Sequence, residues 1–167
     1  MWFALNTRLR HEDFVARQVS AKGYEVFLPV YKSRRRWSDR VKELELPLFP
    51  GYLFSRFDPT HRLPILITPC VIQIVGVGKT PVPVDEKEIV ALQAAARSGL
   101  AGEPRPFVRI GQRVRVEHGP LCGVEGTLLN VKGAQRLVLS VTLLQRSVAL
   151  EIDGASVTPL SQGTRGG

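Results

Sequence analysis

Hydrophobic and polar positions change period several times along the first part of the chain. Residues 2–7 (WFALNT) alternate between the two sides of an extended backbone, which predicts a short strand. Residues 10–22 place apolar side chains at helical spacing with charged residues between them, and Gly23 supplies a C-terminal stop. An amphipathic helix is therefore expected directly after the first strand.

The next stretch has mostly β-type composition. Residues 24–31 (YEVFLPVY) predict a strand, and in residues 44–48 leucines alternate with Glu and Pro. Between these two runs, residues 32–42 are dominated by charge. The pattern predicts a long hairpin with a basic tip, followed by the apolar segment 48–57 (LFPGYLFSRF).

Three further elements complete this half of the chain. Residues 58–60 (DPT) can open a short helix, residues 71–75 predict a strand, and residues 85–98 predict a helix with acids in its first turn. Residues 1–98 thus read strand, helix, strands, helix, strand, helix. This order is typical of an α/β sandwich with helices packed against one sheet.

The second half of the chain has a different composition. Residues 99–106 (GLAGEPRP) contain two Gly and two Pro without periodicity and predict a linker. Residues 107–160 predict a small β-barrel domain, and residues 161–167 a loose tail. The overall fold class is α+β. The short β-type runs of the barrel are 113–117, 124–131, 137–144 and 147–152.

Composition and charge narrow the class of protein. The chain has 167 residues, of which 44% are hydrophobic, which suits one or two small domains and excludes a disordered tail or a large enzyme. The formal net charge is +8. An excess of this size points to a polyanionic partner, and nucleic acid is the leading expectation.

Cysteine spacing and apolar runs indicate the compartment. Cys70 and Cys122 lie 52 positions apart, so the sequence offers neither a metal-ligand cluster nor a disulfide framework. No run approaches the roughly 20 apolar residues of a membrane span, and the N-terminus has no signal-peptide pattern. We expect a cytoplasmic protein with no membrane partner.

Catalytic and cofactor motifs are absent from the sequence. Residues 76–80 (GVGKT) end like a P-loop, but Gln73 stands where that loop requires Gly, and Pro81 interrupts the helix that should follow. The three histidines form no nucleophile, metal or acid–base arrangement. The sequence predicts no enzyme, no cofactor and no metal site.

Two basic clusters are candidate nucleic-acid contacts. The stretch 32–42 carries six positive side chains against one negative, with Trp37 among them; Arg can contact phosphate and Trp can stack on a base. A second cluster lies at the end of the first strand and in the following helix. For both clusters a solvated charged surface remains an equally weighted alternative. The candidate residues are Arg8, Arg10, His11, Arg17, Arg34, Arg35, Arg36 and Arg40.

Aromatic residues crowd into the segment 49–54 (FPGYLF). Alternation places Tyr52 and Phe54 on one face of a strand and Leu53 on the other, so both faces are apolar. A one-sided sheet covered by helices needs only one apolar face. The surplus predicts an exposed docking surface, and the alternative is a central strand covered on both sides.

These residues together resemble the NusG family of bacterial transcription elongation factors. The resemblance covers about residues 1–160. It rests on Trp2, Arg10-His11-Glu12, EVFLP at 25–29, PLFPGY at 47–52, the glycine-rich stretch Gly119-Pro120-Leu121 to Gly126 and residues 144–147 (LQRS). It implies an N-terminal NGN domain followed by a KOW domain with an SH3-like barrel. The segments LPLFPGYLF and RRRWSDR look more like the specialised antiterminators of RfaH or UpxY type.

The resemblance implies a function based on binding. The NGN domain would dock on the clamp helices of RNA polymerase, contact DNA of the elongation complex and suppress pausing or termination. The KOW domain would recruit a small-subunit ribosomal protein or Rho. The expected polymerase contacts are Trp2, Phe49, Pro50, Gly51, Tyr52 and Phe54, and the expected partner contacts of the KOW domain are Gly119, Pro120, Leu121, Gly123 and Gly126.

Two departures from the family pattern bear on these expectations. Cys70 stands where the family has the glycine of a Pro-Gly-Val turn, and Leu121 stands where an aromatic is common. The alternating strands of the second half favour a barrel and no helical state. The rival hypothesis is a ribosome-associated KOW protein that grips RNA through phosphate contacts, with the aromatic segment serving only as core.

Overall fold

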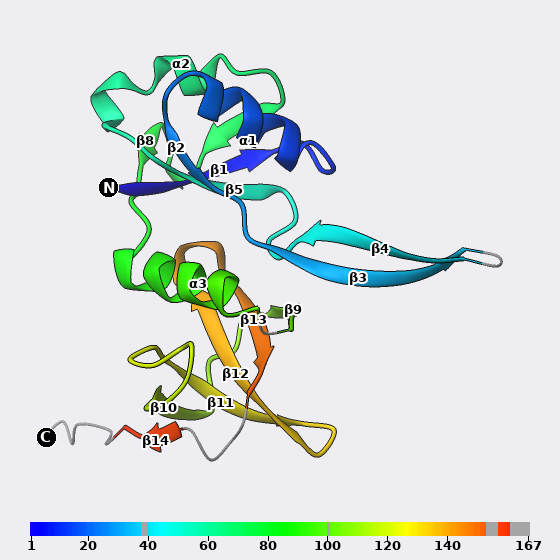
Figure 1. The fold of residues 1–167 in the computed structure, drawn as a ribbon. Coiled ribbons are helices and arrows are strands. Elements are labelled where there is room, and N and C mark those ends of the chain that lie inside the picture. The colour runs from blue at the N-terminus through cyan, green and yellow to red at the C-terminus, as the bar shows by residue number, and fades with distance from the viewer. Residues whose placement is uncertain (38–39, 100, 153–156, 161–167) are drawn as a thin grey trace, which may run out of the picture. The chain divides into compact units, whose positions relative to one another are not determined.

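The computed structural model describes residues 1–37, 40–99, 101–152 and 157–160 (Figure 1). The chain divides into two compact units, residues 1–89 and 90–167. The division falls inside helix α3 (Glu86–Ser98), before the domain boundary expected at residue 98. The predicted tail, residues 161–167, lies outside the described residues.

The first unit is built on a four-stranded antiparallel sheet with the strand order β2-β5-β1-β6. β1 (Trp2–Thr7) occupies the centre together with β5 (Tyr52–Arg56), and Ala4 faces Phe54 across this pair. The edges are β2 (Glu25–Phe27) and β6 (Val71–Ile74). The predicted strand 24–31 is therefore interrupted before Val30, where the chain leaves the sheet.

Helices α1 (Glu12–Ala21) and α2 (Leu63–Leu66) lie on the same side of this sheet (Figure 1). One buried cluster joins helix and strand residues, and the rings of Phe3 and Phe57 stack within it at 4.7 Å between centroids. The alternation of β1 and the helical spacing of α1 thus converge on a single core, as the sequence predicted. Its members are Phe3, Leu5, Val15, Val19, Leu53, Phe57, Ile65 and Ile74.

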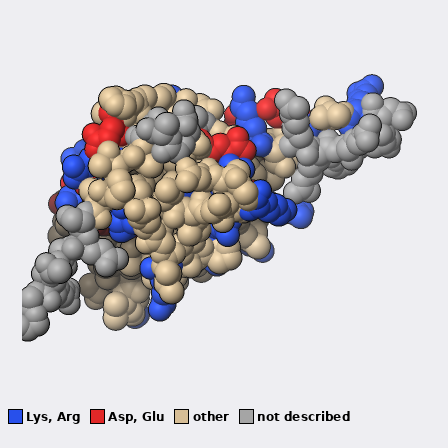
Figure 2. Space-filling model, turned by 90° about the horizontal axis from the view of Figure 1, so that it is seen from below, with Lys and Arg blue, Asp and Glu red and all other residues tan. Residues whose placement is uncertain are grey.

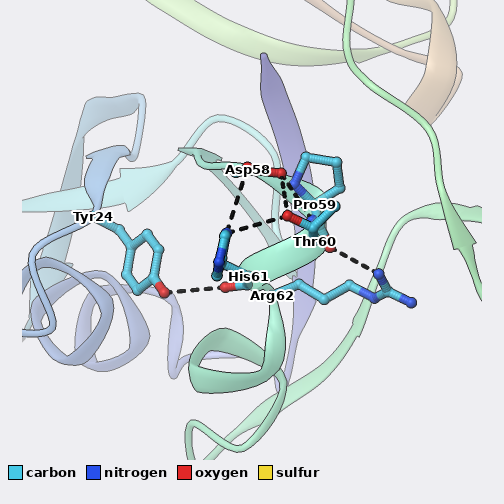
Figure 3. Close-up of polar contacts among 6 residues, drawn as sticks. All are labelled: Tyr24, Asp58, Pro59, Thr60, His61 and Arg62. Atoms are coloured by element: carbon cyan, nitrogen blue, oxygen red, sulfur yellow. Dashed lines mark hydrogen bonds and ion pairs between the residues drawn. The ribbon is translucent and has the colours of Figure 1, made fainter.

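The chain between β5 and α2 makes a short 3-10 turn, η1 (Pro59–His61) (Figure 3). Asp58 caps the turn, because its carboxylate accepts hydrogen bonds from the backbone N–H of Thr60 at 2.9 Å and from the Thr60 hydroxyl at 2.8 Å. The hydroxyl of Tyr24 donates to the carbonyl of His61 at 3.2 Å. The helix start predicted at residues 58–60 is confirmed.

A two-stranded hairpin extends from the first unit: β3 (Val30–Trp37) pairs with β4 (Arg40–Pro47) (Figure 1). It is the long hairpin that the sequence predicted, although the tip residues 38 and 39 lie outside the described part. A smaller hairpin follows, formed by β7 (Gly76–Val77) and β8 (Thr80–Pro81). The P-loop-like motif therefore forms a tight β-turn, as expected from its spacing.

The second unit contains a six-stranded antiparallel sheet with the order β14-β10-β11-β12-β13-β9. The short 3-10 turn η2 (Thr142–Leu144) joins β12 to β13. Consecutive residues of β12 and β13 are buried, so both faces of these strands are covered. The predicted β-runs are confirmed as β10 (Gln112–Val116), β11 (Glu125–Val131), β12 (Ala134–Val141) and β13 (Arg146–Glu151).

Two strands of this sheet have no counterpart in the sequence pattern. β14 (Val157–Pro159) pairs with β10, and β9 (Gly102–Pro106) pairs with β13. The linker prediction for residues 99–106 is thus wrong for residues 102–106. These residues have no strand pattern of their own, and cross-strand pairing holds them extended.

Candidate functional site

A basic loop and an aromatic turn meet at one buried carboxylate. Glu12, the first residue of α1, is 4% exposed. Its Oε1 accepts hydrogen bonds from the backbone N–H of Arg10 at 3.0 Å and from that of Gly51 at 3.1 Å. Arg10 belongs to the basic loop formed by residues 8–11, and Gly51 belongs to the aromatic turn formed by residues 48–52. Glu12 therefore joins two segments that the sequence predicted to bind different partners.

Further backbone hydrogen bonds fix the basic loop. Thr7 N–H donates to the carbonyl of Gly51 at 2.8 Å, and Arg8 N–H donates to the carbonyl of Cys70 at 3.0 Å. Arg10 has a left-handed backbone with φ of 69°. Arg8, Arg10 and His11 are exposed. The loop thus presents its basic side chains from a backbone that is held on both sides.

Cys70 keeps the turn geometry that the sequence put in question. Its φ is 72°, in the left-handed region that glycine adopts most readily. Cys70 therefore adopts a backbone conformation that favours glycine although it carries a side chain. This geometry directs the Cys70 carbonyl to Arg8.

The exposed aromatic face predicted at residues 49–54 is not what the structure shows. Phe49 and Phe54 are 1% and 0% exposed, and their rings meet edge to face at 5.7 Å. Phe54 also stacks with Phe27 at 6.2 Å. Trp2 is buried too, and its carbonyl accepts the N–H of Val84 at 2.8 Å. The side chains of Trp2, Phe49 and Phe54 are therefore buried in this structure.

Only part of the predicted docking set reaches the surface. Gly51 is buried with φ of 84°, Tyr52 is half-buried and Pro50 is exposed. Leu9, 66% exposed, lies beside Gly51, since its Cδ2 would be 3.5 Å from a Cβ at that glycine. Pro50 and Tyr52 are thus the accessible apolar residues of the aromatic turn, and Leu9 of the basic loop lies beside Gly51, which stands between them in sequence; we call these three residues the turn surface.

The remaining predicted basic residues differ in their surroundings. Arg17 is exposed and forms an ion pair with Asp13 one turn earlier in α1, so its charge is partly compensated. Arg40 is exposed on β4. Arg34, Arg35 and Arg36 belong to β3, where the backbone pairs them with residues 43, 42 and 41, and their side chains lie outside the described part of the structure. In the view of Figure 2, Lys and Arg side chains lie at separate places and form no single patch.

The glycine-rich loop of the second unit is a compact turn, residues 117–124. Gly123 N–H donates to the carbonyl of Val116 at 2.8 Å, and Gly119 and Gly123 have φ of 92° and 88°. Leu121 is 2% exposed, so the side chain predicted to contact a partner is buried in this structure. Gly126 is also internal, because a Cβ there would lie 2.7 Å from the carbonyl oxygen of Val138. The loop offers His118, Pro120 and Cys122 at its surface.

Within the described residues, no group of three or more His, Cys, Asp or Glu side chains is arranged to hold a metal ion. No helix in this part of the chain combines the length and apolarity needed to cross a membrane. Cys70 and Cys122 are both free thiols.

Comparison with known proteins identifies the family. The sequence model of NusG, described as transcription termination factor, matches residues 1–93. The chain belongs to the NusG family.

Curated NusG-family relatives extend this match beyond the first unit. The transcription termination/antitermination protein NusG of Helicobacter pylori strain J99 is 30% identical over 118 residues, covering 68% of this chain and 66% of that protein. The protein of the same name from Lactococcus lactis is 28% identical, covering 91% of this chain and 89% of the relative. That from Thermus thermophilus is 27% identical, covering 93% of this chain and 96% of the relative.

A solved structure supports the fold of this NusG-family chain. The structure describing domain interaction in Thermotoga maritima NusG has a TM-score of 0.57 and 19% identity, covering 96% of this chain and 97% of that one. The predicted α+β fold, with an N-terminal NGN domain and a C-terminal β-rich domain, is confirmed. The chain is a transcription termination/antitermination factor and not an enzyme.

The sequence patterns missed Glu12 as a site residue. An acid in the first turn of a helix is favoured by the helix dipole and is normally exposed, so its type and position suggest a surface residue. The sequence feature that could have indicated a role for Glu12 is its position between the basic loop and the apolar face of the helix. Only the fold shows that Gly51 comes within hydrogen-bond distance of it.

Proposed function

We propose that this NusG-family protein docks on the clamp helices of RNA polymerase through the turn surface and contacts DNA of the elongation complex through the basic loop. One observation carries the proposal: Glu12 joins the two segments, so apolar and basic surfaces lie side by side. A protein that holds DNA only while docked on another machine needs these two contacts at fixed relative positions. Binding would suppress pausing or termination by RNA polymerase. The protein would act in the cytoplasm.

The proposal extends to the division of labour along the chain. Residues 1–98 bind polymerase and DNA, and residues 107–160 recruit a small-subunit ribosomal protein or Rho. Because Leu121 is buried, recruitment uses the exposed residues of the 117–124 loop, His118, Pro120 and Cys122. The segments LPLFPGYLF and RRRWSDR support a specialised paralogue of RfaH or UpxY type.

Polymerase capture tests the docking surface. Tyr52→Ala should lower the affinity for purified RNA polymerase by roughly tenfold or more, because a partly exposed aromatic at a contact is a typical hot spot. Phe54 is left intact, since truncating a fully buried Phe costs about 3–5 kcal/mol of stability. Ile110→Ala, which trims an 87% exposed apolar side chain in the second unit, is the control. Equal capture of parent and Tyr52→Ala would refute the docking surface.

A second candidate function keeps one specific observation in its favour. The burial of Phe49 and Phe54 fits a KOW protein that binds ribosomal RNA and uses the aromatic segment only as core. That protein would bind ribosomal RNA with strong salt dependence and would not capture polymerase. Measuring both bindings in one preparation separates the two functions.

A further inference from the structure

The register of the β3–β4 hairpin divides its charges unequally between two faces. Directly opposed residues of an antiparallel pair share a face, and alternate positions along a strand return to it. Tyr31, Ser33, Arg35 and Trp37 of β3 stand opposite Leu46, Leu44, Lys42 and Arg40 of β4. We call this set the cationic face.

The other set, the mixed-charge face, carries acids among its bases. Lys32 stands opposite Glu45 and Arg34 opposite Glu43. Its remaining opposed positions are Val30 with Pro47 and Arg36 with Val41. Carboxylates at directly opposed positions offset the charges of Lys32 and Arg34 and repel an approaching phosphate.

The cationic face has three basic positions and no acid. Arg35 stands directly opposite Lys42, and like charges in this arrangement are destabilising unless an anion lies between them. Trp37 stands two positions further along the same face, opposite Arg40. Arg and Lys neutralise phosphates, and an aromatic ring provides a stacking platform for an unpaired base.

Exposure along the described residues follows the same division. Tyr31, Leu44 and Leu46, at the base of the cationic face, are half-buried. Lys32, Glu43 and Glu45 on the mixed-charge face are exposed. The cationic face therefore has an apolar base and a basic outer half, whereas the mixed-charge face is charged and solvated at these positions.

We infer that the cationic face is a binding surface for a nucleic-acid strand, with phosphates contacting Arg35, Arg40 and Lys42 and an unpaired base stacking on Trp37. The mixed-charge face takes no part. This inference rests on the proposed function and divides the predicted basic hairpin residues: Arg35 and Arg40 contact the strand, and Arg34 and Arg36 do not.

Two double variants with the same change of charge test the assignment. Arg35→Gln/Lys42→Gln should weaken binding of the full chain to a labelled single-stranded DNA by tenfold or more at low salt. Its plot of log affinity against log salt should become shallower by about 1.4, since each phosphate contact on a single strand contributes about 0.7. Lys32→Gln/Arg34→Gln should change the affinity by less than about twofold. Far-UV circular dichroism checks that both variants are folded.

Trp37→Ala distinguishes the form of the nucleic acid. The variant should bind single-stranded DNA several-fold more weakly and bind the matching duplex with unchanged affinity, because paired bases offer no free stacking face. Equal weakening by the two double variants, or none by either, would overturn the assignment to one face. Equal loss of single strand and duplex in Trp37→Ala would overturn the stacking contact.

The same variants separate this inference from the proposed function. Arg35→Gln/Lys42→Gln should still be captured by RNA polymerase, because the turn surface is unchanged. If Tyr52→Ala is captured by RNA polymerase as well as the parent, while the two double variants still differ in DNA binding, only the docking proposal is rejected. If Tyr52→Ala loses capture but the two double variants bind DNA equally well, only the assignment of DNA binding to the cationic face is rejected.

Discussion

Glu12 is the side chain that connects the two segments of the candidate site. Its carboxylate is buried and satisfies two backbone donors from segments far apart in sequence, the loop at Arg10 and the turn at Gly51. A buried donor that loses its acceptor costs about 1–3 kcal/mol. Together with the backbone hydrogen bond from Thr7 to Gly51, this side chain therefore holds the basic loop against the aromatic turn.

Replacing Glu12 tests this role. Glu12→Ala should lower the free energy of unfolding by about 2 kcal/mol, because the N–H groups of Arg10 and Gly51 lose their acceptor. Glu12→Gln keeps an acceptor oxygen and should lose less than about 1 kcal/mol. The neighbouring Asp13 is exposed, and Asp13→Ala should change stability by no more than about 0.5 kcal/mol. Urea unfolding measures all three, and an effect of Glu12→Ala no larger than that of Asp13→Ala would contradict the role.

At the scale of elements, the cap of η1 makes stability depend on pH. The backbone N–H of Thr60, then its hydroxyl, then His61 hold the pKa of Asp58 below its ordinary value of 3.8 (Figure 3). A carboxyl whose pKa is lower in the folded state stabilises the fold above its unfolded pKa. That contribution is lost as the pH falls through the folded pKa.

Comparison of Asp58→Ala with the parent tests the cap. At pH 7 the variant should unfold at lower urea concentration, and the difference should shrink as the pH falls below about 4, where the parent carboxyl becomes protonated. Asp58→Asn retains an acceptor oxygen but does not titrate, so its free energy of unfolding should not show the loss that protonation of Asp58 causes in the parent at low pH. A difference between Asp58→Ala and the parent that is the same at about pH 3 and pH 7 would show that the cap does not act through its charge.

Strand β9 protects one edge of the six-stranded sheet. Glu151 N–H donates to the carbonyl of Ala101 at 2.9 Å, so the hydrogen-bonding groups of residues 101, 103 and 105 face β13. Pro104 and Pro106 alternate with these residues, and their nitrogens, which carry no hydrogen, face outward. Proline at an outer edge prevents another strand from adding to the sheet.

Replacing these prolines restores outward-facing backbone N–H groups, so another copy of the chain should be able to pair with this sheet edge. Pro104→Ala/Pro106→Ala is expected to associate with rising concentration, measured as mass by light scattering after size exclusion. Glu103→Ala, on the inward register, should behave as the parent. Concentration-independent mass in the double proline variant would show that the edge is protected by other means.

At the scale of the whole molecule, the sequence predicted what depends on local periodicity. The alternation of β1, the apolar spacing of α1 and the short runs of β10 to β13 each record which side of an element is buried, so these elements and the α+β class were found. β9 was missed because Gly and Pro obscure the pattern of a strand held by its partner. No local pattern reports such pairing.

The candidate site was predicted in residue type more than in arrangement. Crowded aromatics at 49–54 were recognised, but a single segment cannot show which apolar face is covered, and Phe49, Phe54 and Leu121 proved to be buried. The contact between Glu12 and Gly51 joins distant segments and needs the assembled sheet. What remained accessible, Pro50 and Tyr52 beside the basic loop, defines the surface on which the proposed function depends.

A transcription assay with purified RNA polymerase tests the central claim most directly. Single-round elongation on a template with a defined pause and terminator is scored with no factor, the parent chain, Tyr52→Ala and Ile110→Ala. The account predicts that the parent and Ile110→Ala increase read-through, and that Tyr52→Ala has little effect at the same concentration. Read-through by Tyr52→Ala equal to that of the parent, or none by the parent itself, would contradict it.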